Sequence, residues 1–355
     1  MLKKTLLAGA VMLVAASAQA QTENVTISGV LGAGVLYTNN ASYPNGGARM
    51  QQGNTHAVPF IAFTGREDLG GGASAIFKWA NYVQLDTGGF SPFETFVGLS
   101  SRDYGTVTLG NQYDLLADLV PYTSERFTSN LATHPGNLDR TVGNPLNSLV
   151  KYKSPEMKGF QFGAQYGYGT PTSTTNNGNT MGFSASYTSN PWQFLVVWET
   201  VHDVPYSPRS SLGVPTLYGI DLVKNPTTKV AQNQNTASTG VVYSNAGWRL
   251  MGNYSYTKLS ALGISAKAQT IDVGAYKYVT TALRLGGGYA YTKLENYKWN
   301  VVHAHADYAL SKRTSLYALS VFQAAGQGQV AAMRFQPIAS TSRQVVFEVG
   351  VTHVF

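Results

Sequence analysis

The sequence has no cysteine, no long apolar segment beyond its first twenty residues, and few charges. Without cysteine the folded chain contains no disulfide bond. No stretch after residue 20 is apolar for the ~18 residues that a transmembrane helix needs, which excludes membrane-spanning helices. Charged residues make up 12% of the chain, and the lysines and arginines form no run despite a formal net charge of +7. This scattering argues against a nucleic-acid-binding surface.

The sequence motifs of common catalytic and metal sites are also missing. There is no G-x-S-x-G, no HExxH and no credible spacing for a catalytic triad. The glycine clusters at 70–72 and 286–288 lack the Gly-Lys-Ser/Thr of a phosphate loop, so we interpret them as turn and strand glycines. His303 and His305 alternate with their neighbours along one strand, but two imidazoles do not complete a zinc site. We therefore expect no cofactor and no catalytic residue, and we interpret the histidines as lumen-lining.

The first twenty residues have the order of a secretory signal peptide. Lys3 and Lys4 precede an apolar run from Thr5 to Ala16, and residues 18–20 (AQA) have the small-x-small pattern of a cleavage site. We therefore predict export from a bacterial cytoplasm and removal of residues 1–20. The mature chain, residues 21–355, is expected to form one domain.

The other end of the sequence alternates between apolar and polar residues. Within residues 343–355 (RQVVFEVGVTHVF), large apolar side chains recur at every second position, and the sequence ends on Phe355. This pattern resembles the C-terminal insertion signal of outer-membrane β-barrels, whose final aromatic side chain lies in the interfacial girdle. We therefore interpret Phe355 as part of a membrane insertion signal. The alternative is an ordinary edge strand of a soluble sheet.

Period-two alternation along the whole chain predicts sixteen strands. Short turns alternate with longer polar loops, which lie near 38–56, 113–147, 169–179, 202–236, 259–268 and 325–342. Two unlike rims are typical of an antiparallel up-and-down sheet, and in lipid such a sheet has to close. The sequence thus predicts an all-β fold, a 16-stranded antiparallel transmembrane β-barrel with short periplasmic turns and long external loops. The expected strands are 25–37, 57–66, 73–84, 93–101, 106–112, 148–154, 159–168, 180–189, 191–201, 237–244, 247–258, 269–279, 281–292, 299–310, 315–324 and 343–355.

The alternation also assigns side chains to the two faces of each strand. On 247–258 and 281–292, aromatic and aliphatic residues share one face, whereas Arg249 and Arg284 lie on the other. A charge that faces lipid at mid-bilayer costs ~2–4 kcal/mol, so these arginines are predicted to face the lumen. A polar lumen in so wide a barrel implies a water-filled channel. The same argument places five further charged residues in the lumen, namely Lys78, Lys151, Glu199, Asp307 and Glu348.

The segment 113–147 differs from the other loops because it combines apolar and charged residues. It is either one more external loop or a loop folded into the barrel. The second interpretation is favoured by an apolar group with helix-like spacing, Leu115, Leu116, Leu119 and Val120, since a long external loop has no partner for it. A loop folded inward would narrow the pore. It would bring six charged residues to the constriction, Asp114, Asp118, Glu125, Arg126, Asp139 and Arg140.

The sequence resembles the general porins of beta-proteobacteria over essentially its whole mature length. The motifs that carry the resemblance are TISGV at 26–30, FTGREDLGGG at 63–72, FVGLS at 96–100, YGTVTLG at 104–110, KYKSP at 151–155, DYALSKRT at 307–314 and the terminal strand. The resemblance implies a trimeric outer-membrane channel for small hydrophilic solutes, often with a preference for anions, and no enzymatic activity. The implied partners are two further copies of the chain, outer-membrane lipid and lipopolysaccharide, the barrel-assembly machinery during insertion, and small ions and solutes, but no nucleic acid.

The resemblance further implies that the third loop forms an eyelet with a basic strip on the facing wall. Lys151 matches a wall position that is usually basic in the family, but Phe60 and Asn111 stand where relatives often have arginine. Charge selectivity is expected to follow from the ring of charges in the constriction. We expect this ring to set Lys151 and Lys78 against Asp114, Asp118 and Glu125. Compensation for the thinner basic strip is expected from Arg126 and Arg140 in the loop, or from inward-facing Lys78, Arg249 and Arg284.

Other classes of function remain open from the sequence. An outer-membrane enzyme would place catalytic side chains at the external rim, but no nucleophile has a base beside it. An adhesin would use the loops 202–236 and 325–342 and need not conduct ions. A substrate-specific channel would be supported by a run of aromatic residues along the lumen, and none is evident in the sequence. Ion conductance separates a channel from an adhesin.

Overall fold

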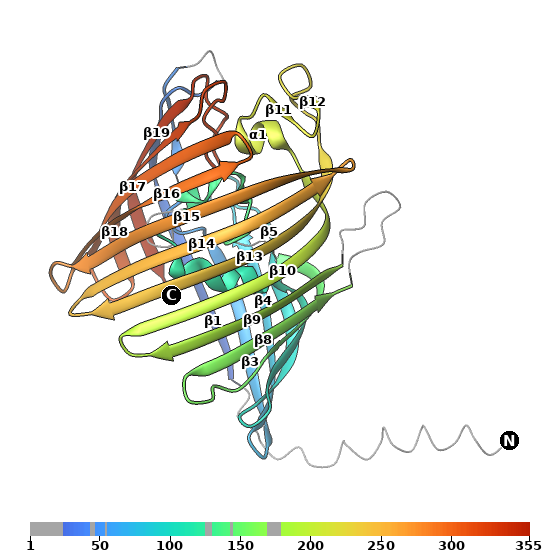
Figure 1. Ribbon diagram of the computed structural model, residues 1–355. Helices are drawn as coiled ribbons and strands as arrows, with labels where there is room; N and C mark the ends of the chain where they lie inside the picture. Colours follow the sequence, from blue (N-terminus) through green and yellow to red (C-terminus); the bar gives the residue numbers. More distant parts are fainter. Residues whose placement is uncertain (1–23, 43–46, 54, 125–129, 143–144, 169–178) are drawn as a thin grey trace.

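In the computed structural model the chain forms a closed antiparallel β-barrel (Figure 1). The structure describes residues 24–42, 47–53, 55–124, 130–142, 145–168 and 179–355. The predicted signal peptide, residues 1–20, lies outside these ranges. None of the helices in the described ranges is both long enough and apolar enough to cross a membrane.

Sixteen long strands make up the barrel wall, which confirms the predicted architecture. They are β1 (Asn24–Thr38), β3 (Phe60–Gly70), β4 (Ala73–Val83), β5 (Phe90–Ser101), β6 (Gly105–Tyr113), β7 (Pro145–Lys153), β8 (Phe160–Gly167), β9 (Thr180–Ser189), β10 (Trp192–Tyr206), β13 (Val230–Asn245), β14 (Trp248–Ala261), β15 (Ile264–Tyr278), β16 (Leu283–Leu294), β17 (Tyr297–Ala309), β18 (Thr314–Ala325) and β19 (Arg343–Val354). The other elements within the described ranges are the strands β2 (Arg49–Gly53), β11 (Thr216–Leu217) and β12 (Ile220–Asp221), the helix α1 (Pro208–Leu212), and the 3₁₀ helices η1 (Leu115–Tyr122), η3 (Asn130–Ala132) and η4 (Pro135–Asn137).

The barrel closes where the first and last strands pair. The register of β1 and β19 runs from Val30 opposite Val354 to Thr38 opposite Val346. Gly29 and Phe355 add two backbone hydrogen bonds of 3.1 Å, one in each direction. On its other side β1 pairs with β3 and, further along, with β2. Each of the sixteen wall strands therefore has a hydrogen-bonded neighbour on both sides, as a lipid environment requires.

The outer and inner faces of the wall differ as the alternation predicts. On β14, Leu250 is 45% exposed on the outer face, whereas Arg249 points inward and donates a 3.1 Å hydrogen bond to the carbonyl oxygen of Pro121. On β16, Leu285 is exposed on the outer face, and Arg284 is half-buried on the inner one. The outer face is thus apolar along the strands and suits contact with lipid.

One predicted loop is wrong. Residues 259–268 were expected to form a long external loop, but β14 and β15 pair as far as Ala261 opposite Ile264. The two-residue turn between them is Leu262-Gly263, in which both residues have positive φ angles, 53° and 75°. Tight hairpins of this kind need the left-handed region at both central positions, which glycine adopts without strain.

The loop expected at 202–236 is shorter than predicted. β10 continues to Tyr206, and β13 begins at Val230. At this end of β13 the outward residues are Ala231, Asn233 and Asn235, which alternate with inward Gln232 and Gln234. A strand that is polar on both faces shows no apolar alternation, so the sequence pattern could not reveal it.

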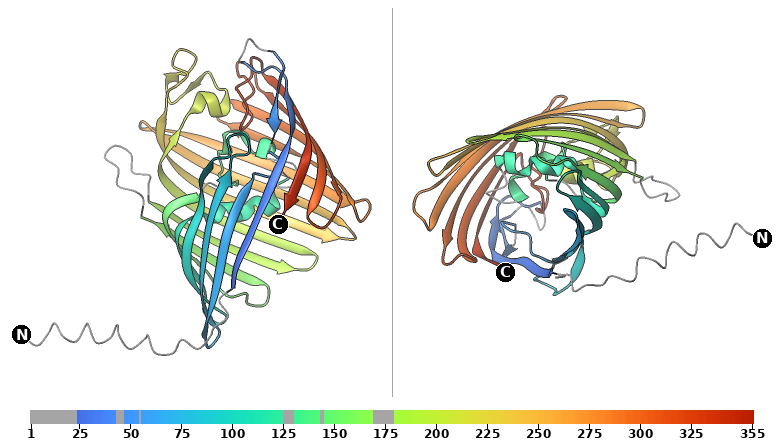
Figure 2. Two further views of the ribbon diagram at one scale, coloured as in Figure 1. Left: turned by 180° about the vertical axis from the view of Figure 1, so that it is seen from behind. Right: turned by 90° about the horizontal axis from the view of Figure 1, so that it is seen from below.

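Loops inside the barrel pack on apolar clusters of the inner wall, where the sequence predicted a polar wall. Figure 2 shows the helical part of the 113–147 segment inside the barrel. In a first cluster, η1 packs on Leu195, Val242 and Met251 of the wall. In a second, the α1 and β11–β12 segment covers Leu259 and Trp299. A third cluster joins Leu131 of η3, Met333 of the β18–β19 loop, and the strands β17–β19.

Candidate functional site

The segment that follows β6 turns into the barrel and forms η1. Asp114 caps this helix, because its Oδ1 accepts a 3.1 Å hydrogen bond from the backbone N–H of Ala117. The backbone N–H of Leu115 donates to Oε1 of Gln165 on β8 at 2.8 Å. The apolar side of the helix is buried against the wall through Leu115, Leu116 and Leu119. The helix therefore lies on the inner face of β8–β10, β13 and β14.

Glycines in the wall allow the loop to approach closely. A Cβ atom added to Gly240 on β13 would lie 2.5 Å from Cβ of Tyr122. A Cβ atom added to Gly274 on β15 or to Gly288 on β16 would lie 2.4 Å or 2.3 Å from Cβ of Ser124. Carbon atoms that are not bonded to each other cannot come this close. The absence of a side chain at these three wall positions therefore sets how closely residues 122–124 approach the wall.

A buried ion pair joins the two ends of the loop. The guanidinium of Arg140 donates to Oδ2 of Asp114 from Nη2 at 2.6 Å and from Nε at 3.1 Å. Both residues are buried, and Glu199 of β10 lies close enough to act on the arginine. Burial by itself lowers the pKa of Arg140, but the charges of Asp114 and Glu199 outweigh it and raise that pKa. The loop arginine is therefore a permanent cation facing two carboxyl groups.

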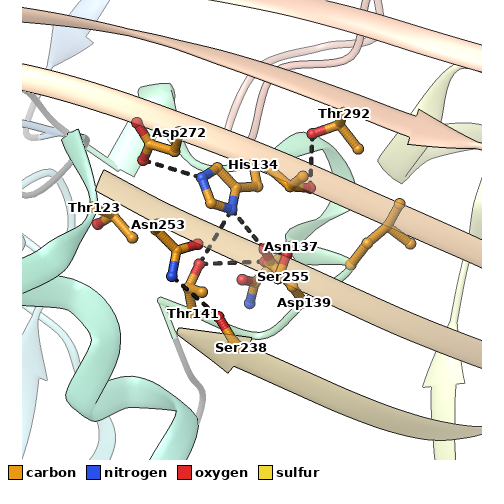
Figure 3. Close-up of polar contacts among 12 residues, drawn as sticks. Thr123, His134, Asn137, Asp139, Thr141, Ser238, Asn253, Ser255, Asp272 and Thr292 are labelled. Carbon is orange, nitrogen blue, oxygen red and sulfur yellow. Dashed lines mark hydrogen bonds and ion pairs between the residues drawn. The ribbon is translucent and has the colours of Figure 1, made fainter. Parts of the chain in front are cut away.

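A second polar cluster fastens the middle of the loop to β14 and β15 (Figure 3). His134 contacts Asp139 through Nδ1 at 2.7 Å and Asp272 of β15 through Nε2 at 3.1 Å. The hydroxyl of Ser255 on β14 donates to Asp139 Oδ2 at 2.5 Å. The backbone N–H of Ser124 donates to Asp272 at 2.9 Å. One histidine thus bridges a loop carboxylate and a wall carboxylate.

The charges of this cluster stabilise one another. Burial by itself lowers the pKa of His134, but Asp139 and Asp272 outweigh that effect and raise the pKa well above its usual value. Burial by itself raises the pKa of Asp139, but the charge and hydrogen bond of His134 outweigh it and lower that pKa. At neutral pH the cluster therefore contains a protonated histidine held by ionised aspartate.

A further set of charged residues lies on the inner face of β4–β7. Lys78 forms an ion pair with Glu94 of β5. Lys153 pairs with Asp118 of η1 at 2.7 Å, and both side chains of this pair are partly exposed. On the same strand as Lys153, the ammonium of Lys151 donates a 2.8 Å hydrogen bond to the carbonyl oxygen of Tyr113. This wall therefore presents lysines to the interior, and one of them contacts a carbonyl oxygen.

The described ion pairs differ from the predicted ring of charges. Lys78 and Lys151 were expected to face Asp114 and Asp118. In direct ion pairs Lys78 meets Glu94, Asp114 meets Arg140 and Asp118 meets Lys153, whereas the charges of Asp118 and Asp114 act on Lys151 without a direct pair. The remaining predicted residues are placed as follows: Arg140 pairs with Asp114, Asp139 with His134, Arg249 with the Pro121 carbonyl and Arg284 with Asp307, while Glu125 and Arg126 lie outside the described residues. Of the two positions without the family's arginine, Phe60 packs on Phe93, and Asn111 lies at a bulge opposite Thr95.

Several residues of the site were missed from the sequence. Lys153 has the same strand parity as Lys151, and this signal was sufficient to find it. Glu94 alternates with the exposed Val97 and Leu99 along β5, so the same signal was sufficient to place it on the inner face. Asp272 alternates with the exposed Ile271 and Val273, which was sufficient to place it on the inner face. His134 lies in a loop and carried no signal, because its wall partner is 138 residues away along the chain.

The family model described as "Gram-negative porin" matches residues 6–319. The chain belongs to the Gram-negative porin family. It is therefore an outer-membrane channel protein rather than an enzyme, which agrees with the apolar outer face of a closed barrel and with the loops packed inside it.

Individual relatives place this porin among proteins of Gram-negative bacteria. It is 26% identical to outer membrane porin protein 32 of Delftia acidovorans over 386 residues, which covers all of both chains. Among solved structures, the anion-selective porin from Comamonas acidovorans has a TM-score of 0.78 at 21% identity, over 94% of this chain and all of that one. The trimer form of OmpT from Vibrio cholerae has a TM-score of 0.70 at 15% identity, over 94% of this chain and 99% of that one.

Proposed function

We propose that this porin forms a homotrimeric channel for passive diffusion of ions and small hydrophilic solutes, with a modest preference for anions. The observation that carries the proposal is the unequal access to charges inside the barrel. Glu199 and Glu348 are 1% and 0% exposed, so both carboxyl groups are shielded from a passing ion. Lys151 is half-buried, and its ammonium contacts a carbonyl oxygen.

Close ion pairs account for most of the other charges on the inner wall. The pairs Lys78–Glu94, Lys153–Asp118 and Arg284–Asp307 each combine one cation with one anion. A close pair presents little net field to a passing ion, so the cations held by carbonyl oxygens decide the sign of the selectivity. One of these is Lys151, which binds the carbonyl oxygen of Tyr113. The selectivity described for the Comamonas acidovorans porin supports the same sign.

The segment 113–147 is the proposed constriction loop. Its support comes from its position inside the barrel and from its two fastenings, at Arg140 and at His134. A loop held at both points stays against β8–β10 and β13–β15, so that the pore runs between the loop and the wall that bears Lys78 and Lys151. These two lysines, the loop acids and Arg140 are the proposed selectivity residues.

The proposed trimer is supported by the family resemblance and by the trimer form described for OmpT. The proposed interface includes parts of β1, β3 and β19 and the loop near residues 86–92. A hollow of about 530 Å³ lies on the outer face of β1 and β3–β6, lined by residues such as Val25, Phe77 and Leu99. Such a hollow is suited to take apolar side chains of a neighbouring copy.

Reversal potential in a planar bilayer tests the proposal. Purified protein is inserted into a bilayer separating two KCl concentrations, and the zero-current potential and conductance steps are recorded. We expect threefold-grouped steps and a potential of the sign that chloride preference produces. The substitution Lys151→Glu should shift that potential toward cation preference, because it reverses an accessible charge in the wall.

The matched control is Lys312→Glu, which makes the same charge change in the exposed turn between β17 and β18. It should leave the reversal potential close to that of the unmodified protein. Equal shifts for both variants would place Lys151 outside the constriction. A correctly folded protein without conductance would contradict the channel itself.

A further inference from the structure

Four aromatic rings lie together on neighbouring strands β3–β6. The ring of Phe93 stacks on Tyr82 with a centroid distance of 4.3 Å. Phe60 and Tyr113 each meet Phe93 edge to face, at 5.5 Å and 5.6 Å. The phenol oxygens of Tyr82 and Tyr113 are 3.1 Å apart. We call these four residues the aromatic strip, since they form one connected surface across four strands.

The aromatic strip faces the inside of the barrel. Phe60 stands opposite Tyr82 in the register of β3 and β4, two residues from Ala62 and Ala80, which are buried on the inner face. The outer face of the same two strands carries Phe63 and Trp79 instead, and Trp79 is exposed.

A cation from another part of the chain also reaches the strip. The charge of Arg334, from the loop between β18 and β19, acts on both Tyr82 and Tyr113. That loop folds inward, because the backbone N–H of Ala332 donates to Oε1 of Gln323 at 2.6 Å in a buried contact. The rings and this cation therefore share the interior of the barrel.

The strip is less covered than the apolar residues of the other wall. All four rings are half-buried, whereas Leu116 and Trp299, which the loops cover, are fully buried. Covering aromatic surface that is otherwise exposed to water lowers the free energy, because apolar area is removed from water. A passing solute with a ring could cover it, because aromatic rings favour edge-to-face and offset-stacked contacts.

Three cations lie near the strip, one of which, Lys78, is ion-paired with Glu94. The ammonium of Lys78 lies 5.3 Å from the centre of the Phe93 ring. The ammonium of Lys151 is bound to the carbonyl oxygen of Tyr113. Arg334 also lines a polar cavity of about 310 Å³, together with Arg140 and Gln234. A solute whose ring lies on the strip can therefore direct an anionic group toward Lys151 and Arg334.

We propose that the aromatic strip and the cations beside it form a binding site for small aromatic carboxylates that enter the pore. The ring of the solute contacts Phe60 and Tyr113, whose edges meet Phe93, and its carboxylate lies toward Arg334 and Lys151. The inference rests on the proposed function, since the solute has to reach the strip through an open channel. The site favours ring-bearing acids over aliphatic acids of the same charge.

Blockade of the chloride current by benzoate tests the site. Conductance in KCl is recorded first, and then sodium benzoate or sodium acetate is added to the same membrane. We expect benzoate to reduce the current in a saturable manner and acetate to have little effect. The substitutions Phe60→Leu and Tyr113→Leu should each raise the half-blocking concentration of benzoate, and together on the order of tenfold, because ring contacts are removed while volume is largely kept.

Phe63→Leu is the matched control, since it removes a ring from the outer face of the same strand as Phe60. It should leave blockade by benzoate unchanged. The inference is overturned if benzoate reduces the current no more than acetate does. It is also overturned if benzoate blocks Phe60→Leu and Tyr113→Leu at the same concentration as the unmodified protein. Conductance in KCl separates this failure from a failure of the proposed function. A normal chloride current without ring-dependent blockade would contradict the binding site alone, whereas an absent current would contradict both the binding site and the channel.

Discussion

The wall formed by β3–β7 and the wall formed by β10 and β13–β18 have the same strand geometry but differ in what covers their inner surfaces. The first presents lysines and half-buried rings to the interior, as at Lys78 and Phe60. The second presents buried apolar residues such as Val242 and Trp299 beside buried polar ones such as Asp272, and loops cover it. Strand alternation sets which side chains point inward in both walls. The chemistry of those inward positions decides whether a loop docks there or the wall stays open to solutes.

Breaking the buried ion pair between Arg140 and Asp114, which joins the two ends of the loop, is expected to have the largest effect on stability. Arg140→Met leaves Asp114 and Glu199 without their cation in a buried place, and such a loss costs ~3–5 kcal/mol. The free energy of unfolding in urea, followed by tryptophan fluorescence, should fall by that amount. Arg313→Met, in an exposed turn, should change it little, and a similar small change for Arg140→Met would contradict a structural role for the pair.

Truncation of the apolar contact between η1 and the wall should have the next largest effect. Leu116→Ala removes a fully buried side chain, and deletions of this kind cost ~2–5 kcal/mol. The same truncation at Leu99, which is 62% exposed on the outer face, should cost much less in detergent. If both variants unfold at the same urea concentration, η1 contributes no packing energy to the barrel.

The stability of the contact that His134 makes between the loop and β15 should depend on pH. Its pKa is raised in the folded protein, so its contribution to stability is complete below its ordinary pKa of roughly 6.5 and is lost as pH rises through the raised value. The groups that face it are Asp139 and Thr141 of the loop, Asp272 of β15, and, through Ser124, His303 of β17. Current noise from loop motion should therefore increase at alkaline pH.

His134→Asn tests this interpretation, because asparagine keeps hydrogen bonding but does not titrate in this range. The variant should show the noisier current already at neutral pH and no further alkaline transition. The pKa of Asp139 is lowered, so its own contribution is lost only as pH falls through that lowered value. An unchanged alkaline transition in His134→Asn would assign it to another group.

The smallest effect on stability is expected on the open wall. Lys153→Met breaks the partly exposed pair with Asp118, and pairs of this kind contribute ~0–1 kcal/mol. The unfolding midpoint should hardly move, while the reversal potential should shift toward cations by less than it does in Lys151→Glu. A large loss of stability would mean that this pair, like Arg140–Asp114, belongs to the loop fastening.

The sequence predicted the barrel well because alternation is a local property. The expected strand 180–189 has the bounds of β9, and the terminal strand 343–355 differs from β19 by one residue. Alternation failed near Asn233, where the strand is polar on both faces, and near Ser260, where the outward residue is polar and the apolar neighbours Leu259 and Ala261 face inward. Alternation also gives the face of a residue but not its position along the barrel axis. It could not show that Asp118 forms its ion pair with Lys153 and not with Lys151, two residues away.

The aromatic strip could not be seen in the sequence for a related reason. Its four rings are contributed by four strands, and bulges after Ala80 and Gly110 shift the register of two of the pairings. The bulges bring Phe93 and Tyr113 to the level of Tyr82. A search for aromatic residues along single strands therefore finds no run, although the folded wall has one.

Gly240, Gly274 and Gly288 lie where the loop contacts the wall, so they influence the width of the channel. These positions lie behind the loop, away from any solute, and residues 122–124 occupy the room left by their missing side chains. Adding one carbon atom there would displace the loop toward the opposite wall without altering any group that a solute touches. The bore of the channel and the chemistry of its lining can therefore be adjusted separately, one from behind the loop and the other from the open wall.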